Sequence, residues 1–312
     1  MGGWASLRFV DDRGAERATR TARAARDELR RIERKFSRYI PASIVSCINR
    51  DAGRTPVAVD DETLRLVTAG LSLARATGGA FDPTSGVYRR AWSFSPSGRS
   101  GGRVPADSEI EALRPLVDHG AVRLRDATIF LPRARMELDL GGVGKEYAAD
   151  RAAACLQSHG IRSAIVNLAG DVRTIGSRGD GRPWSVGIVD PRRPGRIRFR
   201  VRFVGGAGVA TSGDYERCVV VDGVRHHHLL DARTGRPARG VASCTVVAPT
   251  AFEAGLAATG AFLLGFDEGA AWLERSGLEG VLIGESGELR STPGMSRLSD
   301  LPGSLYEDYP AI

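Results

Sequence analysis

Residues 136–150, MELDLGGVGKEYAAD, form the stretch of sequence that decides the fold. A strand-like run, Glu137–Leu140, stops at Gly141-Gly142, and a helical pattern that carries Lys145 follows at once. Glycines at such a turn let the backbone approach a phosphate closely, and free amides at the start of a helix favour anions. After the helix comes IRSAIVNLAGDVRTIG, which we interpret as an apolar strand ending on Gly170-Asp171. The pattern therefore predicts a strand–turn–helix–strand unit with an anion site at its turn.

The length and composition are typical of a globular protein. The 312 residues are 42% hydrophobic, enough to bury a large core in one or two domains. An apolar run of 18 or more residues is absent, so we expect no membrane-spanning helix. The first residues, MGGWASLRFVDDRG, lack the build of a signal peptide. We expect a cytoplasmic location for the chain as given, or a periplasmic one if an export signal precedes it.

The net charge of +7 comes almost entirely from arginine, since Lys35 and Lys145 are the only lysines. The arginines are scattered and aromatic residues make up only 6%, which argues against nucleic-acid binding. Against so many arginines, the lysine at position 145 indicates a preference for a compact ammonium group.

The four cysteines lie far apart in the sequence, with no C-x-x-C pair. This spacing argues against a metal cluster, a redox motif or a disulfide framework. We expect all four to be buried small hydrophobic residues, Cys47, Cys155, Cys218 and Cys244.

The order of predicted elements indicates an α+β fold. Helical periodicity covers 14–38, 60–76, 250–264 and 267–276, and a polar, glycine-rich loop expected to be mobile covers 95–106. Strand patterns lie near 121–124 and 127–131, through most of 184–247, and at 279–283. Helices and strands do not alternate strictly, so we predict largely antiparallel sheets with packed helices in one compact unit, 1–312, whose residues 295–312 form a loose tail.

Eight segments of the chain, in order and at matching spacing, resemble the ApbE family of FAD:protein FMN transferases. One such segment would be weak evidence, but eight in sequence are not chance. The resemblance implies an ApbE-like (T-fold-like) architecture. The segments are 1–3 (MGG), 36–49 (FSRYIPASIVSCIN), 78–86 (GGAFDPTSG), 139–150 (DLGGVGKEYAAD), 167–171 (NLAGD), 211–217 (TSGDYER), 227–238 (HHLLDARTGRPA) and 248–265 (APTAFEAGLAATGAFLLG).

The resemblance also implies which residues contact FAD. GGAFDPTSG alone would be ordinary turn chemistry, and several of the other residues would otherwise be packing or capping residues. In the family's pattern, Asp82 would accept a hydrogen bond from the adenine amino group. The implied FAD contacts are Met1, Tyr39, Ala80, Phe81, Asp82, Asp139, Lys145 and Leu230.

Catalytic and metal roles follow from the same resemblance. The carbonyl of Gly142 and the hydroxyl of Thr259 would hold Mg²⁺, a hard cation that takes oxygen ligands. Lys145 and His228 would be catalytic, with His228 at the pyrophosphate as a base or orienting group; a purely structural histidine is the alternative. Consecutive histidines at 226–228 on a strand point to alternating faces and so cannot chelate one ion together. Asp231 and Gly235 would shape the turn that follows.

Two positions depart from the family's pattern. Where the family has an aspartate four residues before Thr259, aimed at the same metal, this chain has Gly255, and Glu146 replaces a common glycine. Glu253 lies about 200° around the helix from Gly255 and should face elsewhere. We hypothesise that Asp171 or Glu253 substitutes as the metal ligand, and we expect a Gly255→Asp substitution to raise magnesium-dependent turnover of FAD.

The main functional prediction is FMN transfer from FAD to a Ser/Thr of a partner flavoprotein with a flavinylation motif, releasing AMP with Mg²⁺ assistance. The alternative is an FAD-binding carrier, electron-transfer or regulatory protein that has lost catalysis with the missing carboxylate at position 255. Hydrolysis of FAD to FMN and AMP would be a side activity of the same site. We expect a monomer or a homodimer.

Overall fold

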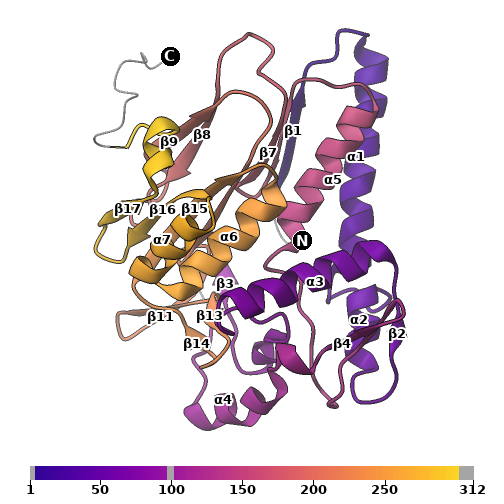
Figure 1. Ribbon diagram of the computed structural model, residues 1–312, viewed down its shortest axis with the longest axis vertical. Coiled ribbons are helices and arrows are strands. Elements are labelled where there is room, and N and C mark those ends of the chain that lie inside the picture. The colour runs from indigo at the N-terminus through magenta and orange to yellow at the C-terminus, as the bar shows by residue number, and fades with distance from the viewer. Residues whose placement is uncertain (1–3, 97–101, 302–312) are drawn as a thin grey trace.

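The computed structural model describes residues 4–96 and 102–301, and its centre is an antiparallel sheet of seven strands (Figure 1). The strand order is β1-β6-β7-β10-β15-β16-β17, so chain neighbours and distant segments pair side by side. Their bounds are β1 (Ala5–Phe9), β6 (Ala164–Leu168), β7 (Asp171–Ile175), β10 (Gly208–Gly213), β15 (Val241–Ala248), β16 (Glu279–Gly284) and β17 (Leu289–Ser291). The predicted antiparallel α+β fold is confirmed.

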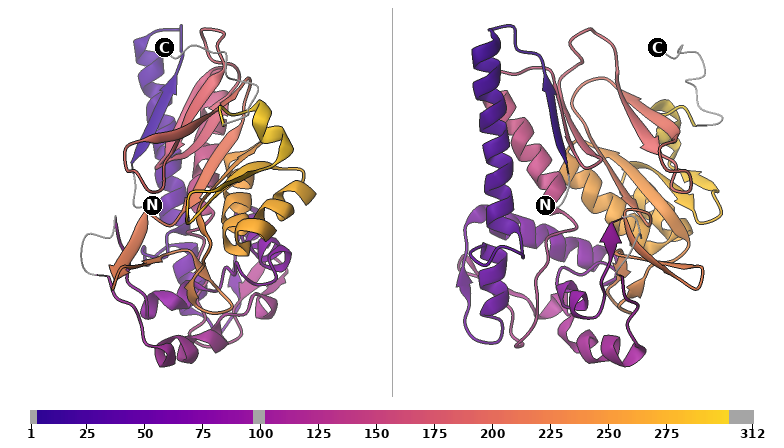
Figure 2. Two further views of the ribbon diagram at one scale, coloured as in Figure 1. Left: turned by 90° about the vertical axis from the view of Figure 1, so that its left-hand side faces the viewer. Right: turned by 180° about the vertical axis from the view of Figure 1, so that it is seen from behind.

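Helices cover one face of this sheet and a hairpin covers the other. The helices are α1 (Ala15–Phe36), α5 (Gly144–Ser158), α6 (Ala251–Leu264) and α7 (Phe266–Arg275), and α6 packs directly on β10 and β15. Along β15, Cys244 and Val246 belong to the core beneath α6, whereas Val247 belongs to the core beneath the hairpin. The hairpin strands are β8 (Trp184–Val189) and β9 (Ile197–Phe203), seen in Figure 2 on the side away from α6 and α7.

Shorter elements gather at one end of the molecule, below the large sheet in Figure 1. The helices there are α2 (Ile44–Arg50), α3 (Asp61–Ala76) and α4 (Asp107–Leu113). Asp60 begins α3 as expected, because its carboxylate accepts a hydrogen bond from the Thr63 backbone N–H at 3.0 Å. The short strands are β2 (Val57–Ala58), β3 (Ser95–Pro96), β4 (Arg123–Arg125), β5 (Thr128–Phe130), β11 (Arg217–Val221), β12 (Val224–His227), β13 (Leu230–Asp231) and β14 (Arg236–Pro237).

The segment 137–140 is not a strand of any sheet, which corrects the expected strand. Only Glu137 makes an isolated bridge, to Ser85. Leu138 pairs instead with the side chain of Asn49, donating to its Oδ1 at 2.7 Å and accepting from its Nδ2 at 2.9 Å. Asp139 donates its N–H to the Pro83 carbonyl at 2.7 Å. Side-chain and loop partners therefore satisfy this backbone where a neighbouring strand would otherwise do so.

The strand predicted to end on Gly170-Asp171 is β6, and it forms a hairpin with β7, which begins at Asp171. The two-residue turn of this hairpin is Ala169-Gly170, with φ of 52° and 103°. Positive φ at both positions is the geometry of the tight turns that match the twist of antiparallel strands. Asp171 therefore begins β7 rather than ending a strand, and its carboxylate lies against the start of α5.

Helices α5 and α6 run antiparallel, and Asp150 fixes their register. The carboxylate of Asp150, on α5, accepts hydrogen bonds from the backbone N–H groups of Ala251 (3.0 Å) and Phe252 (2.9 Å). These are amides in the first turn of α6, which lack partners within their own helix. Arg173 adds an ion pair to Asp150 at 3.2 Å. One turn further along each helix, the same register sets Glu146 opposite Gly255.

The structure differs from the sequence predictions for the C-terminal tail, the cysteines and the loop at 95–106. Residues 293–297 form a short 3₁₀ helix, and Met295 and Leu301 are buried against the sheet, so a loose tail does not begin at 295. Cys218 and Cys244 are buried as expected, but Cys47 and Cys155 are only half-buried; all four are free. The loop at 95–106 includes β3, and its residues 97–101 lie outside the described residues. None of the helices in the described parts of the chain is long and apolar enough to cross a membrane.

Candidate functional site

Three charged side chains meet where α5 begins beside β7. Lys145 Nζ donates to Asp171 Oδ2 at 2.6 Å and lies 3.9 Å from Glu146 Oε1. Asp171 and Glu146 are 2% and 5% exposed, so two carboxylates lie side by side in the interior with one ammonium between them. Burial, and then the charge of Asp171, raise the pKa of Glu146 well above its usual range.

Thr259, a predicted metal ligand, lies one helical turn beyond Gly255 on α6. It is 7% exposed, and its Oγ1 lies 3.0 Å from Ser212 Oγ on β10. Gly142, the other predicted ligand, lies in the exposed turn before α5, where Phe81 approaches it: a Cβ built on Gly142 would lie 3.4 Å from Phe81 Cε2. The roles of Thr259 and Gly142 toward a metal stay predictions.

His228 is a neutral base near Lys145. Burial, followed by the positive charge of Arg217, lowers the pKa of His228 to about 3. Its Nδ1 lies 3.3 Å from the Arg217 carbonyl, so this nitrogen carries the proton and Nε2 is the free base. The neighbouring rings do point elsewhere: His226 stacks near Trp92, and His227 reaches the Ala238 carbonyl at 2.9 Å. Strand β12 ends at His227, so the predicted alternation along a strand covers His226 and His227, and His228 lies in the bend that follows.

Asp82, predicted to contact adenine, is a buried turn-forming residue. Its Oδ1 accepts hydrogen bonds from the Thr84 backbone N–H (2.7 Å) and hydroxyl (2.6 Å). Its Oδ2 accepts from the His119 backbone N–H at 2.9 Å, and His119 Nδ1 lies at the same distance. The structure thus explains Asp82 through the shape of its loop, and an adenine contact stays a prediction.

The loops that carry the other predicted FAD contacts are tied together by backbone bonds. Ala232 N–H donates to the Ala80 carbonyl at 2.9 Å, which joins the GGAFDPTSG loop to the turn after Leu230. That turn forms as expected, with the N–H groups of Thr234 and Gly235 donating to the Asp231 carbonyl. Ala80 is buried and Leu230 half-buried.

Tyr39 and Asp139 share one partner, Arg38. The Arg38 guanidinium pairs with Asp139 Oδ2 at 2.8 Å and donates to the Tyr39 hydroxyl at 3.2 Å. Tyr39 is 72% exposed and so is free to contact a ligand. Met1 lies outside the described residues. Sequence reasoning missed the roles of Arg38 and Ser212, although both lie inside the motifs quoted for the resemblance.

Glu253 caps the N-terminus of α6; it is the other carboxylate that we considered as a substitute metal ligand. It is exposed, and its Oε2 accepts from the Thr250 N–H (3.2 Å) and hydroxyl (2.9 Å) in a capping box. Glu253 therefore faces away from Thr259 as the helical geometry predicts, and the hypothesis that it replaces the missing ligand is wrong. Within residues 4–96 and 102–301, no three His, Cys, Asp or Glu side chains converge as a metal cluster.

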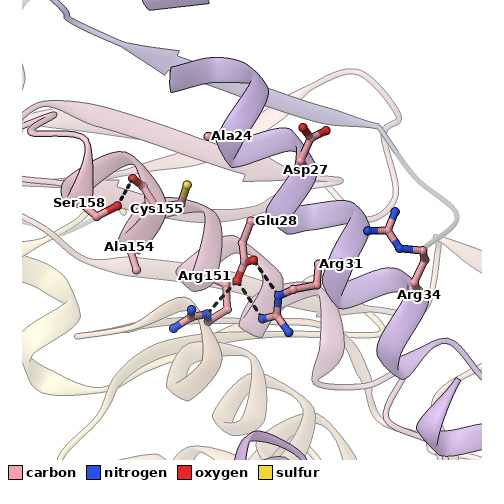
Figure 3. A pocket seen from close by; sticks show the side chains of 9 residues that line it. All are labelled: Ala24, Asp27, Glu28, Arg31, Arg34, Arg151, Ala154, Cys155 and Ser158. Atoms are coloured by element: carbon pink, nitrogen blue, oxygen red, sulfur yellow. Dashed lines mark hydrogen bonds and ion pairs between the residues drawn. The ribbon is translucent and has the colours of Figure 1, made fainter. Parts of the chain in front are cut away.

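A cavity of about 560 Å³ lies elsewhere, between α1 and α5 (Figure 3). Glu28 lies at its centre and accepts hydrogen bonds from Arg31 and Arg151, so the Glu28 carboxylate is already paired with arginine. A smaller cavity of about 180 Å³ is lined by Lys145, Trp4 and Leu168 and opens beside the charged group described above.

Comparison with known proteins identifies relatives along nearly the whole chain. The model of the ApbE family matches residues 1–282. The FAD:protein FMN transferase of Treponema pallidum is 34% identical over 270 residues, covering 81% of this chain and 74% of that protein. The ApbE protein of Thermotoga maritima has a solved structure with a TM-score of 0.82 and 34% identity, covering 93% of this chain and 94% of that one. The flavin transferase ApbE of Vibrio cholerae has a TM-score of 0.82 at 28% identity, over 95% of each chain.

Proposed function

This chain belongs to the ApbE family, and we propose that it is an FAD:protein FMN transferase. FAD is its substrate, and a Ser/Thr hydroxyl of a partner flavoprotein is the acceptor. The hydroxyl oxygen attacks the phosphorus on the FMN side of the pyrophosphate. The P–O bond to the AMP half breaks, AMP leaves, and the hydroxyl proton passes to a base. The products are AMP and a flavoprotein that carries FMN through a phosphoester bond.

The observation that carries this proposal is a neutral histidine near a half-buried lysine that is paired with a buried carboxylate at a glycine turn. His228 holds its Nδ1 proton toward the Arg217 carbonyl, so Nε2 is available to accept the hydroxyl proton. Lys145, held at 2.6 Å by Asp171, places a fixed positive charge where negative charge develops on phosphate oxygens. Charge stabilisation and positioning are most of what phosphoryl transfer needs from a protein.

The donors present fit a magnesium ion. A buried carboxylate oxygen, Glu146 Oε2, has no hydrogen-bond partner, and the Asp171 carboxylate and the Thr259 hydroxyl supply further hard oxygens nearby. When bound, Mg²⁺ would neutralise charge on the pyrophosphate and polarise the phosphorus. The Gly142 carbonyl would add a main-chain ligand from the turn before α5.

The alternative of an FAD-binding protein without catalysis rested on the missing carboxylate at position 255, and the named relatives favour the enzyme. The test is to incubate the protein with FAD, Mg²⁺ and an acceptor peptide that bears a Ser/Thr flavinylation motif. We expect stoichiometric AMP release and a peptide heavier by one FMN, both abolished by EDTA. A Lys145→Gln variant should lose most of this activity. Intact FAD and an unmodified peptide would refute the proposal.

A further inference from the structure

The two departures from the family's pattern, Gly255 and Glu146, touch each other in the structure. A Cβ built on Gly255 would lie 2.4 Å from Glu146 Cγ and 2.9 Å from Cδ. The Glu146 side chain therefore occupies the space in which any side chain at position 255 would begin. The position of Glu146 on α5 therefore requires a glycine at position 255 on α6.

The register of the two helices makes this contact specific. Asp150 binds the amides of Ala251 and Phe252, and Glu146 lies one turn before Asp150, just as Gly255 lies one turn after Ala251. Antiparallel helices held at one such point bring residues at matching turns together. Glu146 therefore projects across the α5–α6 interface toward the face of α6 that also carries Thr259.

The carboxylate of Glu146 has the features of an unsatisfied ligand. The residue is 5% exposed, yet its Oε2 has no hydrogen-bond partner. The ammonium group of Lys145 lies 3.9 Å from Glu146 Oε1 and already donates a hydrogen bond to Asp171. A buried carboxylate oxygen without a hydrogen-bond partner costs free energy, and the Asp171 carboxylate beside it further disfavours the charged form of Glu146. A divalent cation between Glu146 and Asp171 would remove both penalties.

We propose that Glu146 supplies from α5 the metal-binding carboxylate that Gly255 cannot supply from α6. Asp171 and Thr259 complete the protein oxygens on the same side, and phosphate oxygens of FAD fill the remaining positions. The inference deepens the proposed function and rests on it. It predicts, against the expectation from the sequence, that Gly255→Asp alone does not raise turnover, because the new side chain would overlap Glu146.

The test is Mn²⁺ titration of FAD-loaded protein without acceptor, followed by electron paramagnetic resonance of free Mn²⁺. Glu146→Gln keeps a side chain of the same size packed over Gly255 but removes its negative charge. We expect this variant to bind Mn²⁺ at least about tenfold more weakly than wild type. Its affinity for FAD should stay within about threefold of wild type. The matched control is Glu253→Gln, which removes the exposed carboxylate two residues from Gly255 and should leave Mn²⁺ binding unchanged.

Variants that move the carboxylate from position 146 to position 255 separate its role as a metal ligand from its role in packing. Gly255→Asp alone should lower the melting temperature, and Glu146→Gly alone should abolish tight Mn²⁺ binding in a folded protein. The double variant Glu146→Gly/Gly255→Asp moves the carboxylate back to α6 and should recover Mn²⁺ affinity to within about threefold of wild type, since the ligand count is restored. Wild-type affinity in Glu146→Gln, or no recovery in a folded double variant, would overturn the inference.

Failure of the inference is distinguishable from failure of the proposed function. If wild type and Glu146→Gln bind Mn²⁺ equally and both release AMP from FAD, the chain is a transferase whose metal carboxylate lies elsewhere. If wild type binds no Mn²⁺ and leaves FAD intact with an acceptor peptide present, both proposals are wrong.

Discussion

A Gly255→Ala substitution should destabilise the protein, although helix propensity alone predicts the opposite. Replacing a glycine inside a helix by alanine gains about 1 kcal/mol. Here the new methyl group would lie 2.4 Å from Glu146 Cγ and 3.1 Å from Glu146 Cβ. Overpacking of this kind costs about 1–3 kcal/mol, so we expect a net loss of about 1 kcal/mol in the free energy of unfolding.

The same substitution in a Glu146→Gly background should instead stabilise by about 1 kcal/mol, because the overlap is gone and only the propensity term remains. The two backgrounds thus predict a coupling free energy of about 2 kcal/mol between positions 146 and 255. Urea unfolding followed by circular dichroism, without FAD or metal, measures both differences. An equal stabilisation in the two backgrounds would show that Glu146 does not cover Gly255, and the reasoning about the helix interface would fail.

Three further predictions concern the stability of the fold and the protonation of His228. Asp150→Ala should cost about 1–3 kcal/mol in urea unfolding, because two first-turn amides of α6 lose their acceptor; an unchanged midpoint would contradict this. Glu62 accepts hydrogen bonds from Arg31, Lys35 and Tyr147. These bonds, above all the one from Arg31, lower the pKa of Glu62 from 4.5. Its contribution is therefore complete above pH 4.5 and is lost as the pH falls further, so Glu62→Gln should be less stable than wild type at pH 7 with a difference that shrinks in acid; a constant difference would refute the ion pairs. Because the pKa of His228 is lowered to about 3, kcat/KM should show no acid limb near pH 6.5; a limb there that His228→Asn removes would show that this histidine titrates normally.

The order and type of the main elements could be predicted from the sequence because their signals are local. The apolar stripe of α1, the aspartate cap of α3 and the alternation in β8 and β9 each lie within one segment. The strand expected at 137–140 failed for a non-local reason, since its backbone partners are the side chain of Asn49 and a loop carbonyl. The buried segment at 293–301 was missed because its contacts are with strands far away in the sequence.

At the site, residue types were predictable but pairings were not. Lys145 stood out among arginines, and its partner Asp171 lies 26 residues further on. Gly255 and Glu146 each departed from a pattern separately, and over 100 residues divide them. Only the antiparallel register fixed by Asp150 shows that one side chain fills the place of the other.

The most direct test of the central claim is a crystal structure of the protein with FAD and Mn²⁺, recorded at the manganese absorption edge. We predict one anomalous peak within bonding distance of a Glu146 carboxylate oxygen and of the FAD pyrophosphate, about 2.2 Å from each ligand oxygen, on the Thr259 side of α6. A peak bound by pyrophosphate with Glu146 turned away from it, or no peak in an FAD-loaded crystal, would contradict the claim that the carboxylate has moved from one helix to the other.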